Sequence, residues 1–258
     1  MPILLSILML LGGALTGQAA IQSRPVEYKH GDTVLEGHLA YDDAIAGKRP
    51  GILIVHQWMG LGDYEKSRAR QLAEMGYVAF ALDMYGKRVR PTDAREASKP
   101  VTALKSDRPL MRALASAGLA FLKMQPHVDT TKIAAVGYGF GGTGVLELAR
   151  GSAEISGVVC FHGGLDTPIP AVPGDILCRV LVLHGADDPF VPPAEVLAFE
   201  DEMRRCGADW QLVAYGRAVH SFSMPGAGND NSTGAAYNEK ADRRSWEMMK
   251  QFFAEVLE

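Results

Sequence analysis

An acid and a histidine in the last third of the chain have the types and positions needed for proton transfer. Asp188 follows the apolar run RVLVLH at 179–184, and His220 follows the last such run, WQLVAY at 210–215. An acid bonded to a histidine orients the ring and stabilises its charged form, so the ring can take a proton from a nucleophile. We therefore expect Asp188 as the acid and His220 as the base, with Asp187 as the alternative acid.

A Gly-rich turn comes before both residues along the chain. The apolar run IAAVGY at 133–138 leads into GYGFGG at 137–142, and a helical pattern follows over 141–150. In α/β-hydrolases a strand, a sharp turn and a helix form the elbow that presents the nucleophile, and the acid and then the histidine come later. The order of these three features therefore predicts hydrolytic chemistry.

Three further histidines and three cysteines show no pattern of a metal site or a disulfide framework. The histidines each end an apolar run: His56, His162 and His184. We interpret them as polar residues that begin loops or line a pocket, because their spacing matches no set of metal ligands. The cysteines are odd in number and widely spaced: Cys160, Cys178 and Cys206. We expect small buried residues there, not a disulfide framework or a zinc knuckle.

The Gly-rich turn, Asp188 and His220 can meet only if the fold brings the ends of several strands to one edge of a β-sheet. The continuous apolar runs, typical of strands covered on both faces, are 51–56, 77–82, 133–138, 157–162, 179–184 and 210–215. The helical patterns lie at 64–76, 108–124, 141–150, 193–206 and 238–257. Asp63 is the expected N-cap of the first helix, 25–41 is an expected hairpin, and 83–106 is a long loop or short helix. The alternation predicts an α/β fold with a mostly parallel, doubly wound sheet, in which ligands bind beyond the carboxyl ends of the strands.

The composition fits one globular domain. The chain has 258 residues, of which 47% are hydrophobic and 22% charged, with a formal net charge of −4. These values exclude a disordered chain, a collagen and a coiled coil. No segment is strongly basic, which argues against a nucleic-acid partner.

The opening of the chain has the pattern of an export signal. No charged side chain precedes Arg24, and the apolar run at 3–15 is too short to span a bilayer but suits a signal-peptide core. Small residues then permit cleavage near residue 20, although the opening lacks the usual Lys or Arg. The sequence predicts a signal peptide over 1–20, a mature domain over 21–258 without stable membrane insertion, and secretion to the periplasm or outside. An uncleaved anchor or a mispredicted start codon is the alternative.

Six stretches between Val26 and Leu257 together carry a specific resemblance. They are HQWMGLGDYEKSRARQLAEMGYVAFALDMYGK, VGYGFGGTGVLELARG, CFHGGLDTP, HGADDPFVP, AVHSF and YNEKADRRSWEMMKQFF. In them the chain resembles the dienelactone hydrolase family. The resemblance implies an α/β-hydrolase fold and cleavage of a small-molecule ester or lactone through a Cys nucleophile, without a metal or organic cofactor.

The resemblance also implies roles for single residues. Asp188 and His220 take the acid and base positions, and the oxyanion hole consists of the backbone N–H groups of Trp58 and Phe140. The elbow of the family reads G-x-C-x-G-G, and in this chain Gly139 stands at the Cys position. Because Gly has no side chain, the usual covalent step is lost.

Four interpretations of Gly139 follow. The protein binds a small molecule without turnover, or His220 activates a water that takes the place of the nucleophile and gives weak or altered hydrolysis. Alternatively, Gly139 is a sequencing or engineered change from Cys, or another residue such as Cys160 or Thr143 attacks instead. In every case we expect an intact fold, because Gly adopts the strained elbow conformation easily.

The substrate pocket also departs from the family pattern. Gln57 stands where some members carry a Glu beside the Cys. Two arginines grip a substrate carboxylate in the dienelactone-cleaving members, and their positions hold Lys87 and Met224 here. Ser221 matches a further pocket residue, and Phe222 follows it. The resemblance thus implies substrate contacts from Gln57, Lys87, Ser221, Phe222 and Met224. The aromatic residues Trp58 and Phe140 add to the prediction that this pocket is more apolar than that of the dienelactone-cleaving members.

The glycines of the turn also spell a nucleotide-binding motif. Gly137, Gly139 and Gly142 form G-x-G-x-x-G between a strand and a helix, as in dinucleotide-binding oxidoreductases. Such a site also needs an acid at the end of the next strand, where this chain has Cys-Phe-His at 160–162. A dinucleotide-binding oxidoreductase is therefore kept only as a remote alternative.

Overall fold

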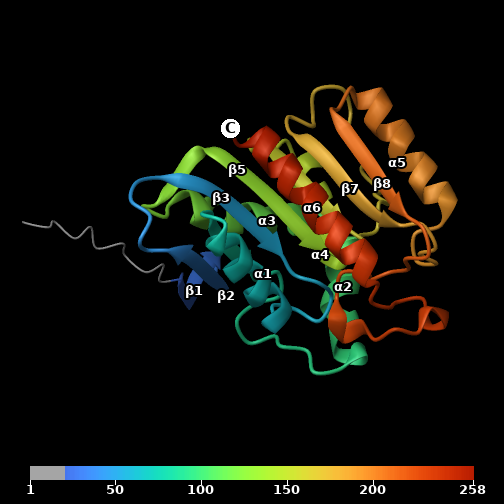
Figure 1. The fold of residues 1–258 in the computed structure, drawn as a ribbon, viewed down its shortest axis with the longest axis horizontal. Coiled ribbons are helices and arrows are strands. Elements are labelled where there is room, and N and C mark those ends of the chain that lie inside the picture. Colours follow the sequence, from blue (N-terminus) through green and yellow to red (C-terminus); the bar gives the residue numbers. More distant parts are fainter. Residues whose placement is uncertain (1–20) are drawn as a thin grey trace, which may run out of the picture.

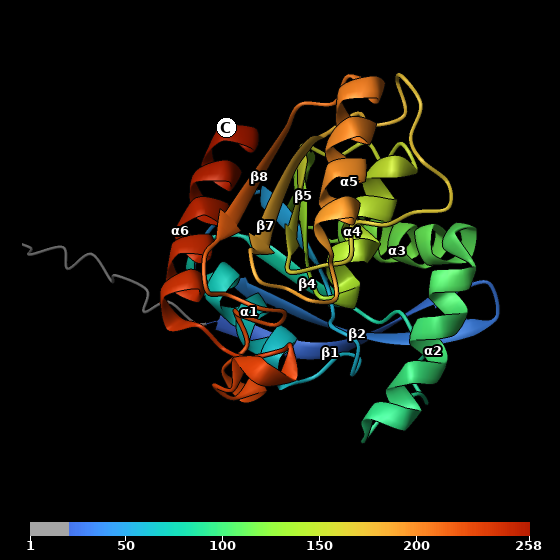
Figure 2. The same cartoon turned by 90° about the vertical axis from the view of Figure 1, so that its right-hand side faces the viewer.

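The computed structural model describes residues 21–258, which form one eight-stranded sheet with helices on both faces (Figures 1 and 2). The strands are β1 (Ile21–His30), β2 (Thr33–Asp42), β3 (Arg49–Val55), β4 (Val78–Leu82), β5 (Val128–Tyr138), β6 (Gly157–Phe161), β7 (Arg179–Gly185) and β8 (Trp210–Tyr215). The helices are α1 (Asp63–Glu74), α2 (Ala94–Ser106), α3 (Arg108–Lys123), α4 (Phe140–Arg150), α5 (Pro193–Cys206) and α6 (Glu239–Val256), with short 3₁₀ turns at Pro225–Ala227 and Asn231–Thr233. The predicted α/β fold class is confirmed.

The strand order explains how distant parts of the chain reach one edge. The strands lie in the order β1-β2-β4-β3-β5-β6-β7-β8. The hairpin β1-β2 is antiparallel, and β2 pairs antiparallel with β4, whereas every pairing among β3 to β8 is parallel. The carboxyl ends of the parallel strands therefore share one edge, where ligands bind in open α/β sheets.

The two faces of the sheet are covered by different helices. In β3, Leu53 and Val55 pack with residues of α3 and α4, and Ile52 and Ile54 pack with residues of α1 and α6. Successive side chains of a strand point to opposite faces, so this apolar run is buried on both sides. Figure 2 shows α6 and α1 on one side of the twisted sheet and α3, α4 and α5 on the other.

The helix starts follow local capping chemistry, with one correction. Asp93, Asp107 and Asn238 accept backbone N–H bonds at the starts of α2, α3 and α6. Our expectation of Asp63 as the N-cap of α1 was wrong by one residue. Gly62 is the N-cap, and the Glu65 carboxylate accepts its N–H at 2.9 Å.

The expected signal peptide lies outside the described residues and stays a prediction. Described structure begins with β1 at Ile21, four residues earlier than the hairpin start expected from the sequence. Across residues 21–258, no helix combines the length and the apolar character needed to cross a membrane.

Candidate active site

The elbow forms at the carboxyl end of β5, where the chain turns sharply into α4. Gly139 has φ +54° and ψ −114°, and its N–H donates to the carbonyl of Phe161 at 3.0 Å. A Cβ on Gly137 or Gly141 would overlap the carbonyl oxygens of Gly141 and Val55 respectively. These glycines therefore allow the helix to pack close to the strands. Gly142 is confined as well, because a Cβ there would lie 2.8 Å from Cys160 Sγ and 2.9 Å from Gly163 Cα. Close packing and the positive φ of Gly139 thus account for the G-x-G-x-x-G spacing without a nucleotide.

Asp188 and His220 come together as the sequence predicts. His220 Nδ1 lies 2.9 Å from Asp188 Oδ2. The other carboxylate oxygen of Asp188 accepts the N–H of Phe190 at 2.8 Å, and Asp188 is buried. The carboxylate is thus held by the loop after β7 and orients the ring, so that Nε2 is the free end of His220. Asp187, the alternative acid, makes no such bond within residues 21–258.

The free end of His220 points to Gly139. A Cβ placed on Gly139 with ideal geometry would lie 3.4 Å from His220 Nε2, and its other neighbours would be Gln57 Cβ and His162 Nδ1, both at 4.0 Å. We call the volume in front of the Gly139 Cα, bounded by these three groups, the Gly139 space. The Nε2 atom of His220 therefore faces the position from which a side chain at the elbow would extend.

The expected oxyanion donors belong to two well-held segments. Phe140 is the first residue of α4, so its N–H lacks a partner within the helix. The Trp58 N–H has no acceptor within the described part of the chain. The loop around Trp58 is fixed by Tyr85, whose hydroxyl donates to the Trp58 carbonyl at 2.8 Å, and by Gln57, whose Oε1 accepts the Met59 N–H at 2.8 Å.

The expected pocket residues divide into two groups. Gln57 lies at the Gly139 space, and Ser221, with φ +58°, and Met224 lie in the loop that follows His220. Lys87 is not brought to this group, because its ammonium pairs with Glu27 and lies 3.6 Å from Glu36.

Phe222 requires a correction. We expected it in the pocket wall, but it is fully buried, and its ring packs edge-on against His162 at 5.0 Å between centroids. The sequence analysis missed Phe190, which is 58% exposed and has its ring 5.4 Å from that of His220. Its place two residues after Asp188 is the only sequence signal that could have indicated it.

Within residues 21–258, neither of the two candidate side chains takes the place of the nucleophile at the elbow. Cys160 is fully buried, and burial raises the pKa of its thiol to about 12, so it does not form a thiolate readily. The Thr143 hydroxyl donates to the carbonyl of Gly164 at 2.9 Å and is engaged in packing α4. All three cysteines are unpaired and buried, as expected. Among residues 21–258, no group of three or more His, Cys, Asp or Glu side chains could hold a metal ion.

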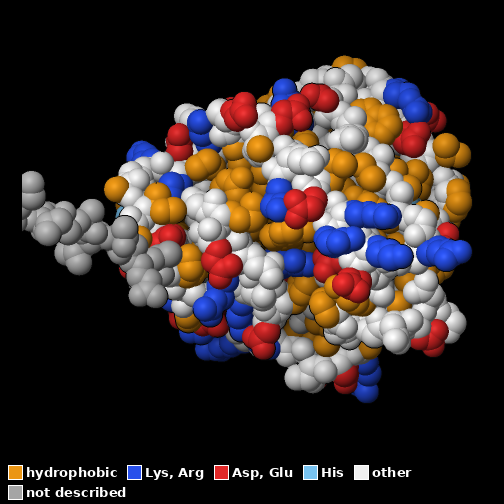
Figure 3. All heavy atoms as spheres, in the orientation of Figure 1, with side chains coloured by type: hydrophobic (Ala, Val, Ile, Leu, Met, Phe, Trp, Pro, Cys, Tyr) orange, Lys and Arg blue, Asp and Glu red, His pale blue; other side chains and the backbone are white. Residues whose placement is uncertain are grey.

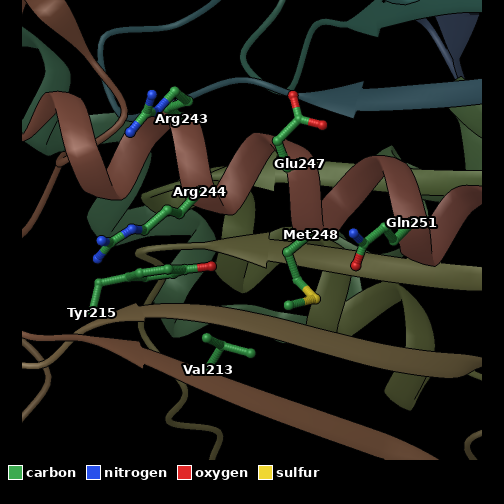
Figure 4. Close-up of a pocket in the computed structure, with 7 residues that line it drawn as sticks. All are labelled: Val213, Tyr215, Arg243, Arg244, Glu247, Met248 and Gln251. Atoms are coloured by element: carbon green, nitrogen blue, oxygen red, sulfur yellow. The ribbon is translucent and has the colours of Figure 1, made fainter.

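A separate hollow lies between β8 and α6 and contains none of these residues. It is lined by Val213, Tyr215, Arg243, Arg244, Glu247, Met248 and Gln251. On this face, which carries α6, Lys and Arg side chains gather beside apolar ones (Figure 3). Figure 4 shows the Arg244 side chain extended beside the Tyr215 ring.

The sequence places the chain among known proteins. Residues 35–257 match the dienelactone hydrolase family. The chain belongs to this family. A putative carboxymethylenebutenolidase of Yersinia pestis is 24% identical over 230 residues, covering 86% of this chain and 84% of that protein. An uncharacterized protein of Caenorhabditis elegans, K02A2.1, is 37% identical over 144 residues, which is 55% of this chain and 90% of that protein.

Solved structures agree with this membership. A dienelactone hydrolase-like promiscuous phosphotriesterase, P91, from metagenomic libraries superposes with a TM-score of 0.85 at 41% identity, covering 93% of this chain and all of that chain. A protein named m3DLH superposes with a TM-score of 0.87 at 40% identity over the same shares. The α/β-hydrolase fold expected from the sequence is therefore confirmed, and the oxidoreductase alternative is set aside.

Proposed function

We propose that the protein hydrolyses small esters or lactones with a water molecule in place of the family's Cys nucleophile. The observation that carries this proposal is the direction of His220. Its Nδ1 is bonded to Asp188, and its Nε2 lies 3.4 Å from the Cβ position of Gly139. A water in the Gly139 space is within reach of the base.

The proposed reaction needs one proton shuttle. His220 Nε2 takes a proton from the water as the water oxygen attacks the carbonyl carbon, and the carbonyl oxygen gains the negative charge. The N–H groups of Trp58 and Phe140 stabilise that oxyanion. When the tetrahedral intermediate collapses, His220 gives its proton to the leaving alcohol oxygen, and the acid product is released.

We expect this activity to be slow. In a serine protease that lacks its triad, the oxyanion hole and substrate binding still leave roughly 10³–10⁴-fold acceleration over water. A positioned base adds to this, but a water is a weaker nucleophile than a thiolate.

We expect neutral substrates with apolar groups. The Lys87 ammonium is already paired with Glu27 and Glu36, so it does not replace the arginine grip on a carboxylate. The exposed rings of Trp58 and Phe190 offer apolar contact instead. The similar protein P91 is described as a promiscuous phosphotriesterase, and phosphotriesters are also neutral, which supports testing paraoxon beside carboxylic esters.

The second candidate is a binding protein without turnover, favoured by the missing side chain at Gly139. We propose for either candidate that residues 1–20 direct export and that the ligand is a small ester or lactone.

The test is hydrolysis of p-nitrophenyl acetate by unmodified protein, His220→Ala, Asp188→Asn and Gly139→Cys. We expect a low rate for unmodified protein, a fall to background for His220→Ala, and a gain of at least about tenfold for Gly139→Cys, which restores the thiol beside the base. Asp188→Asn should lower the rate because the ring loses its orienting charge. A rate in unmodified protein that is indifferent to His220→Ala contradicts the proposed mechanism. A rate at background with saturable ligand binding supports the second candidate.

A further inference from the structure

We propose that His162 is a second water-binding histidine of the site, which holds the attacking water against His220 from the other side of the Gly139 space. This inference rests on the proposed function and deepens it, because it names the group that positions the water.

The backbone of His162 is held in an unusual conformation. His162 follows β6 directly and has φ +38°, in the left-handed region that non-Gly residues seldom adopt. Its N–H donates to the carbonyl of Leu183 at 2.9 Å, and only 1% of the residue is exposed. Such conformations gather at functional sites, where the surrounding structure enforces them.

A chain of hydrogen bonds fixes the ring. His162 Nε2 lies 2.8 Å from the Ser223 hydroxyl, which lies 2.9 Å from the Tyr64 hydroxyl. Arg68 Nε donates to the same Tyr64 hydroxyl at 3.2 Å, and Arg68 pairs with Asp242 at 2.8 Å. Because Nε2 is committed to Ser223, the direction of the opposite ring nitrogen is fixed as well.

That opposite nitrogen points to the Gly139 space without a partner. His162 Nδ1 is buried and has no hydrogen-bond partner among the described residues, and it lies 4.0 Å from the Cβ position of Gly139. Buried polar atoms are almost always bonded, so an orphan nitrogen that faces a missing side-chain position beside a second histidine indicates a bound water or ligand. The centroids of the His162 and His220 rings are 5.4 Å apart, so the two rings border the same space.

The two histidines have different roles, since His220 accepts a proton from the water and His162 only binds the water. Burial, and then the neighbouring His220, lower the pKa of His162 well below the usual value, so this ring stays neutral when His220 takes a proton. A neutral imidazole offers one donor and one acceptor, and the Ser223 hydroxyl can pair with either form of Nε2. Nδ1 therefore bonds the water in either tautomer. The water gives one proton to His220, bonds His162, and keeps a lone pair for the carbonyl carbon.

Two variants of His162 separate the two ring nitrogens. The amide of Asn reaches the position of Nδ1, and Asn also tolerates positive φ, whereas the amide of Gln reaches the position of Nε2 and keeps the Ser223 contact. We expect His162→Asn to keep kcat for p-nitrophenyl acetate within about threefold of the unmodified protein, because a polar atom still faces the water. We expect His162→Gln to lower kcat at least about tenfold, with KM changed less than about twofold, because the water loses its second partner.

The same variants in the Gly139→Cys background test whether the role belongs to the water. In that background a thiol attacks first, so the acylation burst needs no water in the Gly139 space. His162→Gln should change the burst rate by less than about threefold there. A role in packing alone would lower the burst and the unmodified protein's turnover together.

A crystal structure of the unmodified protein gives a readout that does not depend on activity. We expect an ordered water within hydrogen-bond distance of both His162 Nδ1 and His220 Nε2. If that site holds no water, or if His162→Gln is as active as His162→Asn, the inference about His162 is overturned. If His220→Ala does not lower hydrolysis, the proposed function is wrong. The presence or absence of the ordered water in the crystal structure then still tests whether His162 binds a water.

Discussion

Gly139 keeps the conformation of a nucleophile elbow although it has no nucleophile to present. Its φ of +54° and ψ of −114° lie in a region that Gly enters easily and other residues do not. Two further residues at the site, His162 and Ser221, have positive φ without being Gly. The backbone strain of the site therefore persists, which fits a site that still positions groups for chemistry.

Restoring the side chain should make the protein less stable. A Cβ at Gly139 meets no atom closer than 3.4 Å, so space is sufficient, but the φ is strained for any L residue. We expect Gly139→Cys and Gly139→Ala each to lower the free energy of unfolding by about 1–3 kcal/mol. Urea denaturation measures this change, and only Gly139→Cys should gain esterase activity. A Cys variant as stable as the unmodified protein would show that the elbow is not strained.

Single residues could be predicted from the sequence where their place after a strand decided their role. Asp188 and His220 follow β7 and β8, and the structure joins them. His162 could not be told from His56 by this rule, since both follow strands. They differ in their partners: His56 bonds the Gln57 carbonyl through Nδ1 and the Met84 N–H through Nε2, whereas His162 has one nitrogen without a partner. Such differences depend on packing, which the sequence pattern does not show.

At the scale of elements, α4 is held on the sheet by a buried group of charges. Glu147 of α4 is fully buried and pairs with Arg112 at 2.8 Å and with Arg150 at 3.2 Å. Arg150 in turn bonds Glu202 of α5 at 2.7 Å. This group joins α3, α4 and α5 behind the elbow, so it fixes the helix whose first residue is the proposed oxyanion donor.

Breaking this group should be costly. Glu147→Gln leaves the neighbouring arginines buried with one carboxylate fewer, so we expect a loss of about 3–5 kcal/mol in the free energy of unfolding. The matched control is Glu247→Gln on α6, where the pair with Lys250 is largely exposed and should contribute at most about 1 kcal/mol. Thermal and urea unfolding compare the two variants. Equal losses would mean that the buried charges do not anchor α4.

The elements themselves were largely predictable, because apolar periodicity marks buried strands and amphipathic helices directly. Their precise ends were not. Residues 83–106 were expected as a long loop or short helix, yet α2 occupies Ala94–Ser106 despite Pro100 within it. The Asp93 side chain caps the first turn of α2 by accepting the Glu96 N–H at 2.8 Å. Likewise, no sequence pattern marks Glu147 as buried, because its partner Arg112 lies on α3 and meets it only in the folded chain.

At the scale of the whole molecule, the fold removes several histidine rings from water: His56, His162 and His184 are buried, and His38 is half-buried. Burial lowers the pKa of four histidines below the usual value: His38, His56, His162 and His184. The cause is the same for each, since a charged ring loses its hydration on leaving water. The sequence predicts that these residues lie at strand ends or within a strand. It does not predict how deeply each ring is buried, because burial depends on how the helices pack against the sheet.

These rings should make folding stability depend on pH in a defined direction. The unfolded chain protonates its histidines as pH falls below about 6.5, while the folded chain does so only at lower pH. The unfolded state therefore binds more protons between these two values, and stability falls as pH falls through that window. Above about pH 6.5 both states are neutral at these rings, so their contribution is constant.

We expect each ring to lower the free energy of unfolding by up to about 1.4 kcal/mol per pH unit between pH 6.5 and its lower pKa in the folded state. Urea denaturation at half-unit steps from pH 8 to pH 5 measures the slope. His162→Asn removes one titrating ring with a residue that tolerates the same φ, so its slope should be smaller by up to that amount. An identical slope in this variant would mean that the pKa of His162 in the folded protein is close to its value in the unfolded chain.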